Sequence, residues 1–235
     1  MLETALYLIP VPLSEGEIDD VLPAGNRRIV AGVRHFIVEN VRSARRFLKK
    51  CDRSIDIDSL TFSELNRHTR PEEVAGMLDP LRRGEPVGVI SEAGCPAIAD
   101  PGADVVAVAQ RERLKVVPLV GPSSIVMSLM ASGFNGQSFA FIGYLPIDTA
   151  ERQRKLRSME QSINAMDQTQ IFIETPYRNN KLLAELARSL PRHLRLCVAS
   201  DVTGSRESIV TRTIGEWGSA KYDYDKIPTI FLLYK

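Results

Sequence analysis

Short runs of apolar and β-branched residues recur along the chain, and most of them are separated by stretches whose apolar positions recur at helical spacing. The runs predict strands at residues 5–9, 28–31, 36–39, 86–90, 115–120, 139–143, 169–174, 194–200, 208–213 and 229–234. The helical patterns predict helices at residues 41–51, 70–83, 104–112, 123–131, 150–166 and 179–189.

The order of these elements predicts an α/β fold of two domains. Strand and helix alternate through the first half, which is typical of a parallel sheet covered by helices. Towards the end, strands follow one another after short turns, so they should pair antiparallel. We therefore expect a mostly parallel N-terminal sheet and a mixed C-terminal sheet, both flanked by helices, with domains at residues 1–117 and 118–235.

Composition changes this picture little. Apolar residues make up 44% of the chain and charged residues 25%, as in ordinary globular proteins. No apolar run approaches the roughly 20 residues of a membrane helix, and the opening MLETALYLIP has neither a basic leader nor a cleavage site. We expect a cytoplasmic protein without membrane contact. Three scattered cysteines and the absence of HxH and HExxH patterns predict no metal site.

Two glycine- and proline-rich loops each follow an apolar run. SEAGCPAIADPG occupies residues 91–102, directly after the predicted strand at 86–90, and GPSS occupies residues 121–124. Prolines fix φ and glycines allow a ligand to approach the main chain, so such loops hold one shape. Since ligands of α/β proteins bind at the carboxyl ends of strands, the two loops predict one cleft.

The polar residues of these loops have both structural and chemical interpretations. Asp100 before Pro101 is typical of a helix start, and this explains the aspartate without a chemical role. Residues 92–97 have no such local explanation, and their amides could bind a carboxylate, a ribose or a base edge. Ser123 and Ser124 could either cap the next helix or contact a ligand. The phosphate-loop motifs GxxxxGK[ST] and GxGxxG and the GxSxG nucleophile motif are missing from the sequence.

Two further groups of residues suggest chemistry. The predicted strand at 169–174 ends in Glu174, followed by a proline and by Arg178, which could hold an anion; a capped helix start with a surface glutamate is the alternative. The predicted helix at 41–51 has basic residues on one face, which either form a solvated surface or contact phosphates; they are Arg42, Arg45, Arg46 and Lys49. With 30 basic and 29 acidic residues, the whole chain has no field that draws it to nucleic acid.

These motifs resemble those of the tetrapyrrole methylase superfamily, and within it the branch of small-subunit (16S) ribosomal RNA cytidine 2′-O-ribose methyltransferases. SEAGCPAIADPG resembles that branch's SDAGTPLISDPG, and residues 117–123 resemble VVPLPGPS. Further along, residues 141–146 resemble FxGFLP, 172–178 resemble FYESPHR, and 199–203 resemble ARELT. Residues 39–42 are similar to EDTR. The resemblance covers nearly the whole chain in the same order.

The resemblance implies an S-adenosylmethionine-dependent methyltransferase with its cofactor in a cleft between two domains. It implies a homodimer whose partner is ribosomal RNA or the small ribosomal subunit. The basic residues Arg42, Arg45, Arg46, Lys49 and Arg178 would then contact RNA, and a carboxylate would accept the hydroxyl proton; Glu39, Glu92 and Glu174 are the candidates. The cofactor contacts that the resemblance implies are Pro10, Gly94, Cys95, Pro96, Ile98, Ser123, Ser124, Ile125, Glu174, Pro228 and Thr229.

The chain also departs from the family pattern. The glycine-containing loop GTPIGNL is replaced by IPVPLSE at residues 9–15, EDTR has Asn40 in place of its aspartate, and SDAG has Glu92 in place of its aspartate. Two alternatives therefore stand beside the RNA methyltransferase: methylation of a small molecule such as a tetrapyrrole, and a degenerate relative that binds the cofactor without catalysis.

Overall fold

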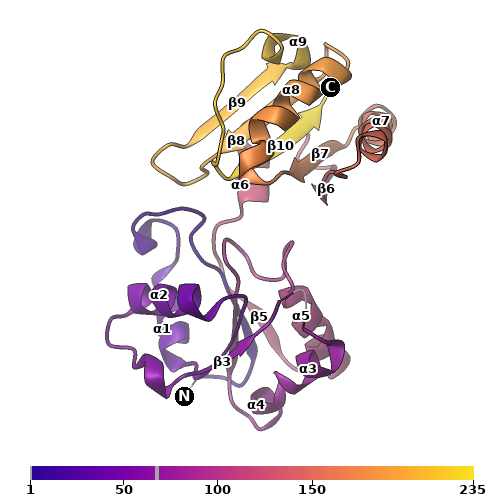
Figure 1. Cartoon of the computed structure of the whole chain (residues 1–235). Helices are drawn as coiled ribbons and strands as arrows, with labels where there is room; N and C mark the ends of the chain where they lie inside the picture. The colour runs from indigo at the N-terminus through magenta and orange to yellow at the C-terminus, as the bar shows by residue number, and fades with distance from the viewer. Residues whose placement is uncertain (1, 67–68) are drawn as a thin grey trace. The chain divides into compact units, whose positions relative to one another are not determined.

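The computed structural model describes residues 2–66 and 69–235. It divides into two compact units, Met1–Ser123 and Ser124–Lys235, which we call unit 1 and unit 2. Figure 1 shows unit 1 from indigo to magenta and unit 2 from pink to yellow. Each unit has a five-stranded sheet of its own.

Unit 1 is built on a wholly parallel sheet in the order β3-β2-β4-β1-β5. The central strand β4 is buried on both faces, as expected for a parallel sheet that carries helices on each side. Its Gly88 lies where a Cβ would come within 2.7 Å of the Ile9 side chain, so a close approach of neighbouring strands requires glycine there. The strands are β1 (Leu6–Ile9), β2 (His35–Val38), β3 (Thr61–Glu64), β4 (Val87–Ile90) and β5 (Val116–Pro118).

The helices of unit 1 cover the two faces of this sheet separately (Figure 1). Val30 of α1 and Leu48 of α2 pack into one apolar cluster, whereas Leu81 of α4 and Val105 of α5 pack into another on the opposite face. The helical segments are η1 (Ile18–Asp20), α1 (Ala24–Gly32), α2 (Val41–Cys51), η2 (Ile57–Ser59), α3 (Pro71–Gly76), α4 (Asp79–Arg82) and α5 (Gly102–Arg111).

Strands β1 and β4 are hydrogen-bonded neighbours, and their following helices cover opposite faces. After β1 the chain enters α1 on one face, and after β4 it enters α5 on the other. Open α/β sheets bind ligands beyond the carboxyl ends of such a strand pair. The topology thus places the loops after β1 and β4 at a binding position.

Unit 2 contains a mixed sheet in the order β6-β7-β10-β8-β9. Strands β6 and β7 are parallel, and the other pairs are antiparallel. The strands are β6 (Phe139–Tyr144), β7 (Thr169–Ile173), β8 (Arg195–Ser200), β9 (Ser208–Thr213) and β10 (Thr229–Tyr234). The helical segments are α6 (Ser124–Ser132), α7 (Thr149–Met166), η3 (Pro176–Arg178), α8 (Asn179–Ser189) and α9 (Ile214–Trp217).

The main core of unit 2 lies between its sheet and helices α7, α8 and α9. Trp217 is almost fully buried there, and its Nε1 donates to the Leu196 carbonyl at 2.8 Å. The opposite face carries α6, which packs against β9 and β10; the Thr211 hydroxyl donates to the Ser132 carbonyl at 2.9 Å. Across the described parts of both units, the helices lack the length and apolar character needed to cross a bilayer.

The predicted fold class is confirmed: unit 1 has the parallel sheet and unit 2 the mixed one. The predicted strand at 28–31 is wrong, because these residues lie within α1. The three apolar residues at 29–31 are too few to distinguish a strand from the buried side of a short helix. Strand β3 was not predicted. Its four residues include one large apolar side chain, Phe62, and it lies at the sheet edge.

Candidate cofactor and substrate site

The loops after β1 and β4 are joined directly to each other. Val11 N donates to Gly94 O at 3.0 Å, and Gly94 N donates to Val11 O at 3.1 Å. Gly94 has φ of +71°, and a Cβ there would lie 3.0 Å from a Leu13 methyl carbon, so this position requires glycine. The segment that replaces the family's glycine-rich first loop is therefore fixed against the 91–102 loop.

The 91–102 loop is held in an unusual backbone conformation by one carboxylate. Ala97 and Ala99 both have positive φ, at 66° and 62°. The Asp100 carboxylate accepts hydrogen bonds from Ala97 N at 2.9 and 3.0 Å and from Gly102 N at 2.7 Å. Burial raises the pKa of Asp100, and these backbone hydrogen bonds oppose the increase. Between the two alanines, Ile98 remains 54% exposed and presents an apolar side chain from a fixed loop.

Residues 120–123 meet the same two loops. A Cβ on Gly121 would lie 2.3 Å from Cβ and Cγ of Pro10, so the two segments can approach only because residue 121 is glycine. The Cys95 thiol lies 3.4 Å from the Pro122 carbonyl oxygen, and burial raises its pKa, which keeps it protonated at neutral pH. Asn26 Nδ2 holds residues 120–123 in this position by donating to Val120 O at 2.8 Å. Three segments thus converge within unit 1.

The residues implied as cofactor contacts divide between the two units. Unit 1 contains Pro10, Gly94, Cys95, Pro96, Ile98 and Ser123. Ser124 and Ile125, both half-buried, begin α6 in unit 2. The other contacts, at residues 174, 228 and 229, lie where β7 ends and β10 begins, and these strands are neighbours. In unit 2, residues 174, 228 and 229 therefore lie at the same end of the sheet.

Glu174 and Arg178 form an ion pair with each other. Arg178 Nη2 donates to Glu174 Oε1 at 2.6 Å, and the same oxygen accepts from Thr175 N at 2.7 Å. The Glu174 side chain is only 8% exposed and that of Arg178 is 29% exposed. Arg178 also lies over the ring of Tyr177, at 5.9 Å. The arginine therefore compensates the charge of this carboxylate and orients it.

Asn179 ties this segment to the start of β10. Its Nδ2 donates to Ile227 O at 2.7 Å and to Tyr224 O and Thr229 Oγ1, each at 3.1 Å. The side chain is fully buried and holds the chain on either side of the exposed Pro228. Sequence reasoning missed Asn179. A buried asparagine at the start of a helix gives no periodic signal that separates it from a surface residue.

Two of the three candidate carboxylates lie together in unit 1. Glu39 and Glu92 follow the neighbouring strands β2 and β4, and Glu92 N donates to Glu39 Oε1 at 3.2 Å. The Ser43 hydroxyl donates to Glu92 Oε1 at 2.6 Å. The third candidate, Glu174, belongs to unit 2. Among the described residues, no group of three or more His, Cys, Asp and Glu side chains forms a set that could hold a metal ion.

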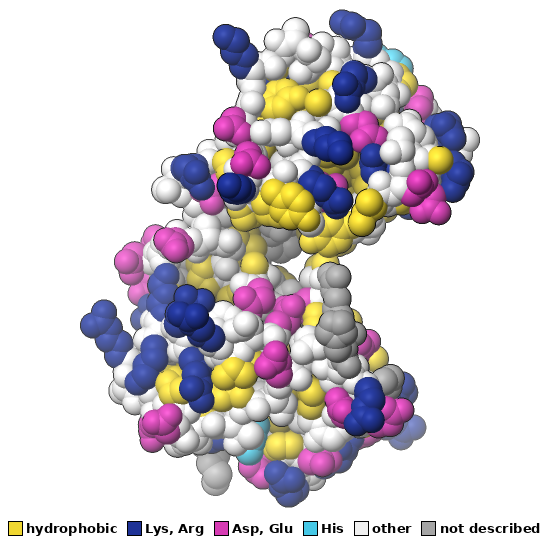
Figure 2. All heavy atoms as spheres, viewed as in Figure 1, with side chains coloured by type: hydrophobic (Ala, Val, Ile, Leu, Met, Phe, Trp, Pro, Cys, Tyr) yellow, Lys and Arg dark blue, Asp and Glu magenta, His cyan; other side chains and the backbone are white. Residues whose placement is uncertain are grey.

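The basic side chains of α2 point in different directions. Figure 2 shows dark blue side chains gathered on the side of unit 1 that carries α2. Arg45 lies over the Phe62 ring at 5.5 Å, and Lys49 Nζ donates to Arg53 O at 3.0 Å. Arg46 instead lines a cavity together with Lys50. Sequence reasoning missed Lys50, although it follows Arg46 by one helical turn and this spacing was the available signal.

Comparison with known proteins identifies relatives over most of the chain. No family model matches it. Ribosomal RNA small subunit methyltransferase I of Vibrio cholerae is 30% identical over 211 residues, which cover 90% of this chain and 69% of that protein. The protein of the same name from Halalkalibacterium halodurans is also 30% identical, over 90% of this chain and 68% of the relative. The chain belongs to this family. It is therefore a methyltransferase, as the motifs predicted.

Solved structures show the same fold at much lower identity. The methyltransferase CobJ matches with a TM-score of 0.64 and 13% identity, covering 98% of this chain and 94% of that one. Cobalt precorrin-4 methyltransferase CbiF matches with a TM-score of 0.62 and 16% identity, covering 98% and 95%. Uroporphyrin-III C-methyltransferase from Thermus thermophilus, solved with S-adenosylhomocysteine, matches with a TM-score of 0.59 and 16% identity, covering 98% and 97%. The chain therefore has the fold of these tetrapyrrole methylases.

Proposed function

We propose that this chain transfers a methyl group from S-adenosylmethionine to a ribose 2′-hydroxyl of small-subunit ribosomal RNA. The observation that carries the proposal is the 30% identity with ribosomal RNA small subunit methyltransferase I across 90% of the chain. The structure supports it through the loops at the ends of β1 and β4, where glycine and proline hold one geometry.

The residues at this position fit such a cofactor. Ile98 offers an exposed apolar side chain to a ring, and Gly94 and Gly121 keep the backbone free of side chains where the three segments meet. Apolar walls with a few fixed polar groups are typical of small-molecule sites. The proposed contacts remain those implied by the family motifs.

The reaction is a displacement in which alignment carries much of the rate. When bound, S-adenosylmethionine supplies a sulfonium methyl group; the hydroxyl oxygen forms the new O–C bond and the C–S electron pair stays on sulfur. The hydroxyl proton must pass to a base. We assign this role to Glu92, because its side chain lines a cavity and its carboxylate accepts a hydrogen bond from the Ser43 hydroxyl, while its backbone nitrogen donates to Glu39 Oε1. Glu174 is less suited, since Arg178 already compensates its charge.

Calorimetry with S-adenosylmethionine and S-adenosylhomocysteine tests the cofactor. Tritium transfer to small ribosomal subunits from cells that lack this modification then tests the substrate. A 2′-O-methyl group protects the adjacent phosphodiester from alkali, so the label should survive as an alkali-stable dinucleotide. Ser124→Arg should remove cofactor binding while circular dichroism stays unchanged, whereas Ser162→Arg on α7 should bind normally. Label in a base, or none in RNA, would contradict the proposal.

The two alternatives give different outcomes in the same experiments. Methylation of a small molecule is favoured by the net charge of +1, which gives no general attraction to RNA. It predicts transfer to a tetrapyrrole and none to subunits. Binding without catalysis is favoured by the 10–15 segment, which has no glycine and is fixed by the Val11–Gly94 pair. It predicts that S-adenosylmethionine binds in calorimetry but that no methyl group is transferred to subunits or to a tetrapyrrole.

We also propose that the protein works as a homodimer in the cytoplasm, where small subunits are assembled. Unit 2 supports the dimer because α6 and β6 expose large apolar side chains; Met130 is 78% and Phe139 is 43% exposed. Figure 2 shows apolar side chains on the surface of this unit. Light scattering after gel filtration should give twice the chain mass. Met130→Glu should shift the dimer towards monomer, and a monomeric wild-type protein would refute the dimer.

A further inference from the structure

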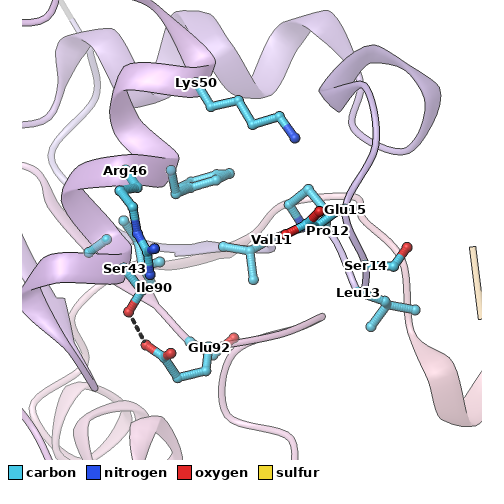
Figure 3. A pocket seen from close by; sticks show the side chains of 13 residues that line it. Val11, Pro12, Leu13, Ser14, Glu15, Ser43, Arg46, Lys50, Ile90 and Glu92 are labelled. Atoms are coloured by element: carbon cyan, nitrogen blue, oxygen red, sulfur yellow. Dashed lines mark hydrogen bonds between the residues drawn. The ribbon is translucent and has the colours of Figure 1, made fainter. Parts of the chain in front are cut away.

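A cavity of about 370 Å³ lies in unit 1 beside the joined loops (Figure 3). Helix α2 forms one wall and residues 11–15 form the other, while Ile90, Ser91 and Glu92 at the end of β4 close the base. Its volume lies within the range of small-molecule sites. Val11, which lines the cavity, is the residue bonded to Gly94, so the cavity adjoins the proposed cofactor loop.

The α2 wall of this cavity is cationic. Arg46 and Lys50 are one helical turn apart, and both line the cavity. Figure 3 shows Lys50 extending from α2 towards the 12–15 segment, whereas Arg46 points towards Ser43 and Glu92. Lys50 Nζ donates to Gly16 O. The Arg46 side chain is exposed and makes no hydrogen bond or ion pair within the part of the chain that the structure describes. A guanidinium and an ammonium group that line the same cavity are suited to a phosphate.

The rest of the cavity is apolar and then anionic. Ala44, Phe47, Val11 and Ile90 contribute apolar surface, and three of them are buried. At the base of the cavity, Glu92 is fixed by the Ser43 hydroxyl at 2.6 Å (Figure 3). A carboxylate only accepts hydrogen bonds, so this side selects a ligand with O–H or N–H donors. The cavity therefore matches a molecule with an anion, a flat apolar part and a donor group.

We propose that this cavity receives one unstacked nucleotide of the RNA substrate, with a phosphate between Arg46 and Lys50 and a hydroxyl or amino donor towards Glu92. The proposal rests on the proposed function and names where its RNA is held. Reading an unstacked nucleotide in a pocket is the usual way in which proteins act on single nucleotides inside RNA. The carboxylate also disfavours a second phosphate on its own side, which fixes the direction of the nucleotide.

The test compares two double variants that each remove two positive charges. Arg46→Ala with Lys50→Ala alters the cavity, and Arg28→Ala with Arg34→Ala alters exposed residues outside it. The first should raise KM for unmodified small subunits about tenfold or more, since hydrogen bonds to charged groups contribute strongly. KM for S-adenosylmethionine should change less than about twofold, and the control variant should leave both constants within that range. Unchanged thermal unfolding confirms that both variants fold.

Binding of a fluorescein-labelled single-stranded RNA, measured with S-adenosylhomocysteine present, gives a second readout. The salt dependence should lose about 0.7 in the slope of log K for each phosphate released from the cavity. An unchanged KM, or an equal loss in the control variant, would overturn the proposal. So would a raised KM for S-adenosylmethionine alone, which would assign the cavity to the cofactor's amino-acid end. If the wild type transfers no methyl group to subunits, the proposed function fails, and RNA binding by the two variants still decides the cavity.

Discussion

Replacing Asn179 by aspartate should cost unit 2 much of its stability at neutral pH. The Asn179 side chain is fully buried, and its amide nitrogen faces three acceptors on residues 224, 227 and 229. Aspartate has almost the same shape, but a carboxylate oxygen, which only accepts hydrogen bonds, replaces the amide nitrogen that donates to these oxygens. It therefore removes the hydrogen bonds and adds a buried negative charge beside three oxygen atoms.

The magnitude follows from comparison with leucine. Asn179→Leu removes two N–H donors, each worth about 1 kcal/mol, but it also removes Oδ1, which has no partner in the described structure. We expect Asn179→Leu to lower the free energy of unfolding by about 2 kcal/mol. Asn179→Asp should lower it by about 4 kcal/mol, because an uncompensated buried charge is added.

Acidification should separate the two variants further. Burial and the facing oxygens raise the pKa of an aspartate at position 179 above its unfolded value. The folded state then binds more protons between the two pKa values, so the free energy of unfolding rises as pH falls through the folded pKa. The protonated acid also regains one donor. Asn179→Leu should show no such recovery.

Trp217 provides the assay. It is the only tryptophan in the sequence and is buried in the core of unit 2, so its fluorescence during urea unfolding reports on this unit. Asn164→Asp, an exposed site on α7, makes the same chemical change and should cost less than about 1 kcal/mol. Equal stabilities of the leucine and aspartate variants at pH 7, or no recovery of the aspartate variant in acid, would refute the reasoning.

Two other predictions concern unit 1. Gly121→Ala should abolish S-adenosylmethionine binding in calorimetry, because the new Cβ would lie 2.3 Å from Pro10. The control variant Gly76→Ala places its methyl group where no atom lies within 4 Å, so it should bind normally. Retained binding in Gly121→Ala would contradict the close approach of residues 10 and 121. The Arg82 fork on Glu112 lowers the pKa of that carboxyl below its usual value. The stabilisation that this ion pair gives is therefore present above the unfolded pKa and is lost as pH falls through the folded pKa. Glu112→Gln should therefore reduce the acid dependence of urea unfolding of unit 1, and an unchanged profile would contradict it.

The fold was predictable where apolar periodicity was long. The predicted bounds 41–51 and 179–189 agree with α2 and α8, because both helices repeat apolar positions over three turns. Residues 28–31 were mistaken for a strand because a run of four residues is too short to show either the helical or the strand periodicity. Strand β3 could not be found, since an exposed edge strand needs few apolar side chains.

The candidate site was predictable only in outline. Glycine and proline marked the loops at 91–102 and 121–124, because close approach of backbones requires those residue types. The hydrogen bonds of Asn179 depend on tertiary contacts that no spacing encodes. Glu174 and Arg178 are only four residues apart, but they lie outside any predicted helix, so helical spacing did not pair them. The cavity on α2 needed the structure as well, because its opposite wall is a segment about thirty residues earlier in the chain.

The hydrogen-bonded pair between Val11 and Gly94 makes the two loops one mechanical piece. Residues 11–13 line the cavity proposed for the nucleotide, and residues 94–98 form part of the proposed cofactor site. A ligand that displaces either loop must therefore move the other or break two hydrogen bonds. By thermodynamic reciprocity, the factor by which RNA changes the affinity for the cofactor equals the factor by which the cofactor changes the affinity for RNA. Two short backbone contacts would thus link the uptake of one substrate to the retention of the other.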